Sequence, residues 1–164
     1  MPFDAFLKIG TIPGESTDDK HKDWIEILSF HWGVSQAAGG TTSGTGGHGG
    51  QRVDVTPFSF VHTVDKASPK LFLACCTGEP IADVTLEVCK ASGDKIKYME
   101  YKLSDVMVSS VRPGGSSQGG DSLPLEEVSF MAAKVQFNYT PLDSKGKPQG
   151  TVPAGWDFSK NAKI

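Results

Sequence analysis

The stretch Asp83-Val84-Thr85-Leu86-Glu87-Val88-Cys89 alternates polar and apolar residues with a period of two. This pattern predicts a β-strand with one face on an apolar core and the other on water, because successive side chains of a strand point to opposite faces. A turn at Ser92-Gly93-Asp94 leads into a second run, from Ile96 to Leu103. Two runs joined by a short glycine-containing turn favour an antiparallel hairpin. The fold is therefore expected to rest on antiparallel β-structure.

The first run of the chain follows the same pattern with one exception. Phe3, Ala5, Leu7 and Ile9 share one face, but Phe6 places a large apolar side chain on the other face. Phe6 therefore interrupts the polar character of the second face.

Two longer runs are apolar on both faces. Residues 24–34 have apolar side chains at even and odd positions, and residues 125–139 change phase midway. The change of phase near Ala132-Ala133 predicts a β-bulge, which lets a strand bend around a barrel. The second apolar face needs cover, from the helix described next or from another copy of the chain. This is the first indication that the chain assembles.

One short helix is predicted at about residues 69–77. Ser68 offers an N-cap oxygen, and Pro69 occupies the first helical position, where its missing N–H costs nothing. Gly78 and Pro80 then end the helix. Because a helix this short is unstable alone, we expect it to pack as a plug against one end or face of the sheet structure.

Two segments lack regular patterning and are expected to be loops. Residues 35–52 contain seven glycines between Gly39 and Gly50, and residues 112–122 are rich in glycine and serine. The composition does not shift around them, so neither is a domain linker. The patterns together predict one domain over residues 1–164. It is mainly β, a compact β-barrel or two-sheet antiparallel fold with one short α-helix and long loops.

Composition and charge exclude several classes of protein. A hydrophobic content of 38% in 164 residues suits a folded globular chain. The formal charge of −3 provides no field that attracts polyanions, so we expect no nucleic-acid partner. No segment approaches the roughly 18 consecutive apolar residues of a membrane span. The N-terminus lacks the basic lead and apolar core of a signal peptide. We expect synthesis in the cytoplasm and no membrane insertion.

The sequence also predicts no metal site, no cofactor and no catalytic residues. Cys75, Cys76 and Cys89 fit neither a disulfide framework nor a zinc site, which needs cysteine pairs two to four residues apart. The four histidines show no ligand spacing on a helix. The adjacent acids Asp18-Asp19 and Glu126-Glu127 point apart on an extended chain and offer no facing acid–base couple.

Two short motifs match enzyme patterns without the context that the chemistry needs. Residues 44–49 match the GxGxxG of dinucleotide sites, but strand-like sequence follows where a helix N-terminus would hold the pyrophosphate. Residues 115–119 match the GxSxG of a nucleophile elbow, which requires a strand, a sharp turn and a helix. The segment that follows, from Gly120 to Pro124, is unlike the start of a helix, so a flexible polar loop is the favoured interpretation.

Several segments run in order along nearly the whole chain: Phe6-Leu7-Lys8-Ile9, Ile12-Pro13-Gly14-Glu15-Ser16, Asp18, His21, Trp24-Ile25-Glu26-Ile27, Ser29-Phe30-His31-Trp32-Gly33-Val34-Ser35-Gln36, Ser68-Pro69-Lys70-Leu71-Phe72-Leu73-Ala74-Cys75, Val108-Ser109-Ser110-Val111, Gly155-Trp156-Asp157 and Asn161. Together these segments resemble the haemolysin-coregulated protein (Hcp) family of the type VI secretion system. The sequence departs from the family in the length and composition of the glycine-rich loop after Gln36.

The resemblance implies a structural protein. Members of this family fold as a β-barrel of two sheets with one helix, and six copies close into a ring. Rings stack into a tube inside a contractile sheath, which expels the tube together with a spike protein at its tip. The lumen carries small effector proteins. The implied protein leaves the cell through this apparatus without a signal peptide, and its partners are itself, the spike, the sheath and effectors.

Two loops are candidate interaction sites on this interpretation. We expect the first to reach the next ring; its candidate residues are Ser35, Gln36, Gly39, Gly40, His48 and Gln51. We expect the second to face the lumen and touch cargo; its candidates are Arg112, Ser116 and Ser117.

Two other classes of protein remain open on the residues alone. One is a small esterase that uses Ser116 in the 115–119 loop. The other is a monomeric β-rich binding module with its site in the loops. The molecular mass in solution separates both from a protein that forms rings.

Overall fold

The computed structural model describes residues 2–36, 52–118, 120 and 123–164. The described residues contain no helix with the length and apolar character that a membrane span requires. Within them, the chain forms eleven strands and one helix, in the following order: β1 (Phe3–Ile9), β2 (Ile25–Ile27), β3 (Ser29–His31), β4 (Val34–Ser35), β5 (Asp54–Val55), β6 (Phe58–Thr63), α1 (Ser68–Thr77), β7 (Ile81–Lys90), β8 (Lys97–Gly114), β9 (Leu125–Tyr139), β10 (Val152–Asp157) and β11 (Ala162–Lys163).

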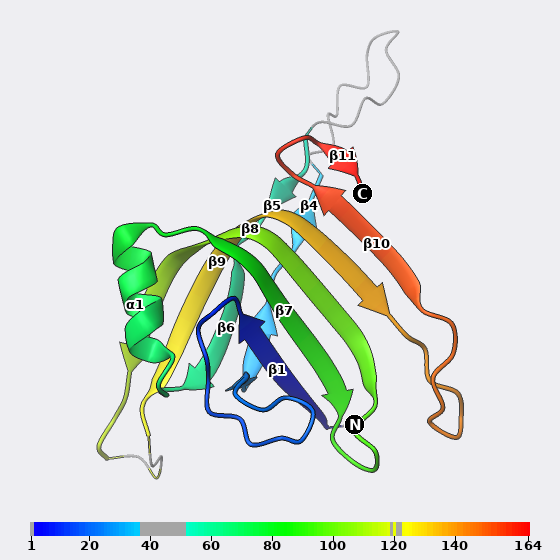
Figure 1. Cartoon of the computed structure of the whole chain (residues 1–164), viewed down its shortest axis with the longest axis horizontal. Helices are drawn as coiled ribbons and strands as arrows, with labels where there is room; N and C mark the ends of the chain where they lie inside the picture. Colours follow the sequence, from blue (N-terminus) through cyan, green and yellow to red (C-terminus); the bar gives the residue numbers. More distant parts are fainter. Residues whose placement is uncertain (1, 37–51, 119, 121–122) are drawn as a thin grey trace, which may run out of the picture.

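The strands form two antiparallel sheets, as the sequence predicted. The larger has nine strands, with a main path of β11-β10-β9-β8-β7-β1-β2, and β4 and β5 form the smaller. β6 pairs with β9 on one edge and with β3 on the other. Because β2 and β3 are consecutive, they link β1 to β6 and curl the large sheet around the core (Figure 1). The described strands do not form a single closed barrel ladder; a backbone hydrogen bond from Leu28 N–H to Val61 O, 2.8 Å long, spans the junction.

The predicted hairpin is confirmed. β7 pairs with β8, with Val84 opposite Leu103 and Leu86 opposite Tyr101. All four of these side chains are buried. Gly93 has a φ of 74° in the turn, the left-handed region that glycine adopts at low cost.

The bulge predicted at Ala132-Ala133 is wrong in its position. β8 and β9 keep one register through this point, and the register shifts instead between Val108 and Ser110. Both strands change their buried parity together, around Asp105 of β8, whose φ is 52°. The other neighbour of β9 changes at the same place, from β6 to β10. The change of phase therefore marks a change of neighbouring strand and not an extra residue in β9.

The run 24–34 is three short strands rather than one two-faced strand. Ile25 and Ile27 of β2 are buried, whereas Leu28 is 61% exposed at the junction with β3. Phe30 and Trp32 then pack against the edge of the core. The parity changes because β2 pairs with β1 but β3 pairs with β6.

The core lies inside the curled sheet and includes one face of the helix. Leu71 and Ala74 of α1 are buried in the same cluster as the strand side chains. Figure 1 shows α1 at one end of the sheet, which agrees with the predicted plug. Gly78 ends the helix with a φ of 69°, as predicted. The predicted cap is wrong: Ala67 is the N-cap residue, and Ser68 is the first helical residue.

Asp65 organises the turn before α1 in place of the predicted cap. Its carboxylate accepts a hydrogen bond from the Ala67 N–H at 2.9 Å, and its own N–H donates to Ser68 Oγ at 3.2 Å. Side chains of Asp and Ser commonly bond to nearby backbone in this way, and the sequence alone does not reveal which residue takes the cap position.

A buried histidine ties β6 to β9. His62 has no exposed surface, and its Nε2 lies 2.8 Å from Glu126 Oε1. Its Nδ1 is 3.7 Å from Asp65 Oδ2, which is too long for a hydrogen bond but close enough for strong charge attraction. Burial lowers the pKa of His62, but the carboxylates of Asp65 and Glu126 together outweigh burial, so the net pKa is raised.

This raised pKa predicts a specific pH dependence of stability. A group with a higher pKa in the folded state stabilises the fold fully below its unfolded pKa, which is 6.5 for histidine. That contribution is lost as pH rises through the folded pKa. The free energy of unfolding, measured by urea denaturation from about pH 6 to about pH 9, should thus fall with pH more steeply in the native sequence than in His62→Gln. His31→Gln, at an exposed position, should retain the native slope. Identical slopes for all three proteins would contradict a charged His62.

Candidate assembly surfaces

The outer face of the β1–β7 pair is covered by the chain itself. Phe6 of β1 points away from the core, yet it is only 1% exposed. The His21 ring stacks on it, with ring centroids 4.1 Å apart and planes 5° apart, and Trp24 packs edge-on against His21 at 4.8 Å. The segment 14–24 therefore supplies the second apolar layer here. The sequence predicted cover by the helix or another copy for the runs 24–34 and 125–139, and it named no cover for Phe6.

The covering segment is held close to the strands. Gly14 N–H donates to Asp23 O at 2.7 Å, and the N–H groups of Ser16 and Asp23 bond back across the same loop. A Cβ atom on Gly14 would lie 2.7 Å from the Cα of Ile25, so only glycine fits this close approach.

His21 is fixed by two carboxylates from different parts of the chain. Its Nδ1 lies 2.7 Å from Asp18 Oδ2, and its Nε2 lies 2.7 Å from Glu87 Oε2 on β7. Lys95 Nζ donates to Asp18 Oδ1 at 2.6 Å. Hydrogen bonds from Lys95 and His21 lower the pKa of Asp18 to about 2. Asp18 thus stays ionised, and it holds the loop to the sheet throughout the physiological range.

Sequence reasoning treated His21 as an isolated histidine and missed this cluster. His21 and Glu87 are 66 residues apart, so no local spacing reveals their contact. The available signal was Phe6, the one apolar side chain on the wrong face of its strand.

Large apolar side chains remain exposed elsewhere on the surface. Some of them face each other across strand pairs: Met107 opposes Met131, and Tyr139 opposes Val152. Clustered apolar side chains on a folded chain commonly mark interaction surfaces. The exposed large apolar residues of the described chain, clustered or not, are Phe3, Leu28, Val34, Phe72, Leu73, Met107, Leu123, Leu125, Met131, Tyr139, Val152 and Ile164.

β10 presents an edge of the large sheet. One side of the strand pairs with β9 along its whole length, but β11 pairs with the other side only at Trp156 and Asp157. Figure 1 shows the first part of β10 at the rim of the sheet. The unpaired part of this edge contains Pro153, which has no N–H, and Gly155 O accepts a hydrogen bond from the Ile164 N–H at 3.3 Å. What the rim offers a second chain is therefore chiefly the exposed Val152 side chain.

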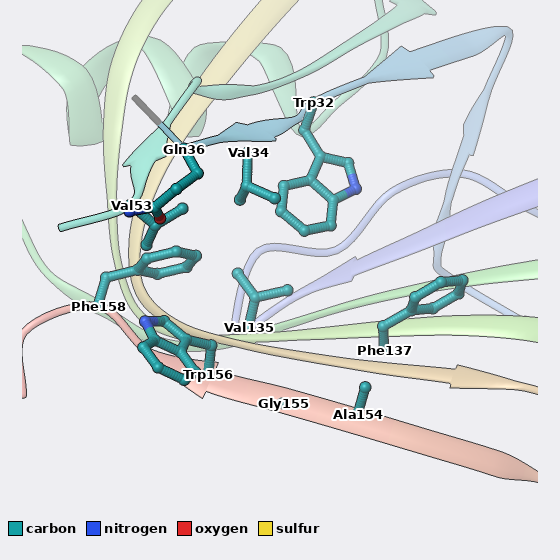
Figure 2. Close-up of a pocket in the computed structure, with 10 residues that line it drawn as sticks. All are labelled: Trp32, Val34, Gln36, Val53, Val135, Phe137, Ala154, Gly155, Trp156 and Phe158. Atoms are coloured by element: carbon teal, nitrogen blue, oxygen red, sulfur yellow. The ribbon is translucent and has the colours of Figure 1, made fainter. Parts of the chain in front are cut away.

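An apolar hollow of about 410 Å³ lies between the small sheet and the β9–β10 pair. Figure 2 shows Trp32, Val34 and Val53 on one side and Val135, Phe137 and Trp156 on the other. The indole N–H of Trp156 is buried without a hydrogen-bond partner among the described residues. An unpaired buried donor costs roughly 1–3 kcal/mol, so an acceptor from a bound molecule would stabilise this site.

The structure locates only part of the proposed ring-stacking loop. Ser35 belongs to β4 and pairs with Asp54 of β5, and Gln36 lines the apolar hollow. Both residues are exposed. The other four candidates lie outside the described residues, as does the GxGxxG match at 44–49: Gly39, Gly40, His48 and Gln51.

The proposed cargo loop is shorter than predicted, because β8 continues to Gly114. Arg112 is therefore a strand residue opposite Glu127, and only Ser116 and Ser117 lie in the connection to β9. All three candidates are exposed.

The connection around Ser116 does not have the geometry of a nucleophile elbow. It joins a strand to a strand, whereas the elbow joins a strand to a helix. Ser116 Oγ accepts a hydrogen bond from the Gln118 N–H at 3.4 Å, and an N–H donor cannot remove a proton from the hydroxyl. The esterase interpretation thus loses its structural basis.

Comparison with known proteins defines the class. Residues 6–139 match the family model described as type VI secretion system effector, Hcp. The chain therefore belongs to the Hcp family and is a structural protein of the type VI secretion system, as its sequence predicted.

Individual relatives support this assignment over the full length. The chain is 38% identical over 165 aligned residues to Protein hcp1 of Pseudomonas aeruginosa strain PAO1, with 99% of each chain covered. A solved type six secretion system protein has a TM-score of 0.92 at 36% identity, and 99% of this chain and 100% of that chain are covered. The crystal structure of Hcp1 from Salmonella typhimurium has a TM-score of 0.79 at 36% identity, with both chains fully covered.

Proposed function

We propose that this protein is a tube subunit that closes into rings of six copies and stacks them into the expelled inner tube. Membership of the Hcp family carries the proposal. The exposed apolar side chains and the partly unpaired edge of β10 supply surfaces for it. A closed ring needs one patch to meet a different patch on the next copy. The β10 rim can supply one patch, and the exposed pair Met107 and Met131 on β8 and β9 can supply the other.

The β10 rim offers a direct test of ring closure. Val152 is 60% exposed and lies opposite Tyr139, so burial of this pair between copies would remove apolar surface from water. Val152→Lys would place a charge in that contact and should convert the ring into monomers. The native protein should have about six times the 17.5 kDa mass of the chain by light scattering.

Thr11→Lys adds the same charge at an exposed turn away from β10 and should leave the ring intact. A ring that survives Val152→Lys would remove β10 from the interface. A native protein that is monomeric at all concentrations would overturn the tube proposal itself.

Stacking of rings is assigned to the segment from Ser35 to Gln51. The proposal follows from the glycine-rich composition and from the exposed position of Ser35 and Gln36 beside the small sheet. Ring-to-ring contacts that must separate after expulsion are expected to be modest and polar, which suits such a segment.

Deletion of residues 39–50 should leave single rings but abolish tubes, because the stacking contact is lost while β10 is unchanged. Negative-stain electron microscopy distinguishes rings from tubes. Loss of both rings and tubes in the deletion variant would indicate a folding defect. Tubes that still form would refute the assignment.

The second proposed contact is between the lumen and cargo. Arg112, Ser116 and Ser117 are exposed and polar, which suits loose contact with varied small proteins. Ser116→Trp should reduce the amount of a small effector protein that copurifies with the ring, with the ring mass unchanged. Equal retention by the native and substituted rings would contradict this role.

The remaining partners follow from the same proposal. The outer surface of the tube would contact the contractile sheath, and its end would carry the spike protein. The protein acts by assembly and not by catalysis, and it leaves the cytoplasm through the type VI apparatus.

A further inference from the structure

Three possible metal ligands meet on the outer face of β7. Glu87 and Cys89 are two residues apart, so their side chains point to the same side of the strand. His21 reaches them from the covering segment 14–24. The ring nitrogen, carboxylate oxygen and sulfur atoms all lie within 4.8 Å of one another. Ligand atoms around one tetrahedral zinc ion lie roughly 3.5 Å apart, so side-chain movements of about 1 Å would bring the three atoms to bonding distance.

The orientation of His21 is the one that metal sites use. Histidine ligands almost always donate their second ring N–H to a carboxylate or carbonyl, which fixes the tautomer and turns the other nitrogen toward the metal. Here Asp18 Oδ2 lies within hydrogen-bond distance of His21 Nδ1, at 2.7 Å, and stacking on Phe6 fixes the orientation of the imidazole plane. Nε2 is thereby directed at Glu87 and Cys89.

The charges around the cluster favour a cation. Four carboxylates lie in or next to it, Asp4, Asp18, Glu87 and Glu100, whereas three ammonium groups face them, Lys95, Lys97 and Lys102. Lys97 Nζ is 3.5 Å from Glu87 Oε1, which leaves Oε2 directed at His21. The local balance is negative, and a divalent ion would offset it.

Burial and donor type select the kind of ion. His21 is 2% exposed and Cys89 is fully buried, while the Glu87 side chain is 19% exposed and provides the route of entry. Nitrogen and sulfur donors suit zinc-like ions, whereas calcium and magnesium require oxygen donors. We propose that His21 Nε2, Glu87 and Cys89 Sγ bind one Zn²⁺-like cation, with Asp18 as the residue that positions the histidine.

Binding of the ion would release protons from the ligands and replace the hydrogen bond between His21 and Glu87. Two protons leave to solvent when the ion binds: the proton of the Cys89 thiol, and the proton shared between His21 Nε2 and Glu87 Oε2, which lie 2.7 Å apart. The contact between His21 Nε2 and Glu87 becomes two bonds to the metal. The ion would then link the segment 14–24 to β7 through His21 and Glu87, which are 66 positions apart in the sequence. This role is separate from ring assembly and opposes the sequence prediction of no metal site.

Cobalt(II) is a suitable probe, because a cobalt–thiolate bond gives a charge-transfer absorption in the near ultraviolet. The chain has three cysteines, so the test uses Cys75→Ser/Cys76→Ser protein, in which Cys89 is the one remaining thiol. Titration with Co²⁺ should give this absorption with one equivalent bound, and Zn²⁺ should abolish it by displacement. Zn²⁺ should also raise the melting temperature of the same protein.

Two further variants assign the ligands. His21→Gln should lose the absorption, and Asp18→Asn should weaken Co²⁺ binding by about 10–100-fold, the usual effect of losing the carboxylate behind a ligating histidine. His31→Gln, at an exposed position, should bind as the parent does. Absence of the charge-transfer band in the parent protein would overturn the proposal. Undiminished binding by folded Asp18→Asn or His21→Gln would do so too.

Discussion

The structure depends on one constraint: the apolar inner face of its strands, and Phe6 on the outer face of β1, must be removed from water. The inner face is satisfied by curling of the nine-stranded sheet around a core that includes Leu71 of α1. The outer face of β1 is satisfied locally, where His21 stacks on Phe6. What the chain cannot cover by itself, including the Met107–Met131 and Tyr139–Val152 pairs, remains exposed. This remaining exposed apolar surface is available for contact with other copies of the chain.

Polar contacts decide how the covering pieces are attached. The segment 14–24 is held through His21 between Asp18 and Glu87, with Lys95 fixing Asp18 in its ionised form. β6 is held to β9 through His62 and Glu126. In both places a histidine joins segments more than sixty residues apart, and its ring also contacts an aromatic side chain. Such buried hydrogen-bonded contacts are costly to break, because removing one partner leaves the other buried and unsatisfied. They therefore give the curled sheet a single arrangement.

The exposed surfaces divide naturally between strong and weak contacts. The β10 rim carries the exposed Tyr139–Val152 pair, which suits a lasting apolar contact within the proposed ring. Ser35, Gln36, Ser116 and Ser117 are small or polar and exposed, which suits contacts that form and release. Under the proposed function, a tube that is expelled and then disassembles would need both kinds of contact.

The sequence by itself determined the antiparallel class, the β7–β8 hairpin and the helix with its glycine end, because each depends on neighbours within a few residues. It also determined the family, since the matching positions run in order along the chain. Only the tertiary structure decided the rest. The phase change in β9 is a change of neighbouring strand rather than a bulge, and the run 24–34 is broken where its partner changes from β1 to β6. The meeting of His21, Glu87 and Cys89 was equally out of reach. Strand pairing and loop docking join distant residues, and no local periodicity records which distant segment will supply the opposite side of a contact.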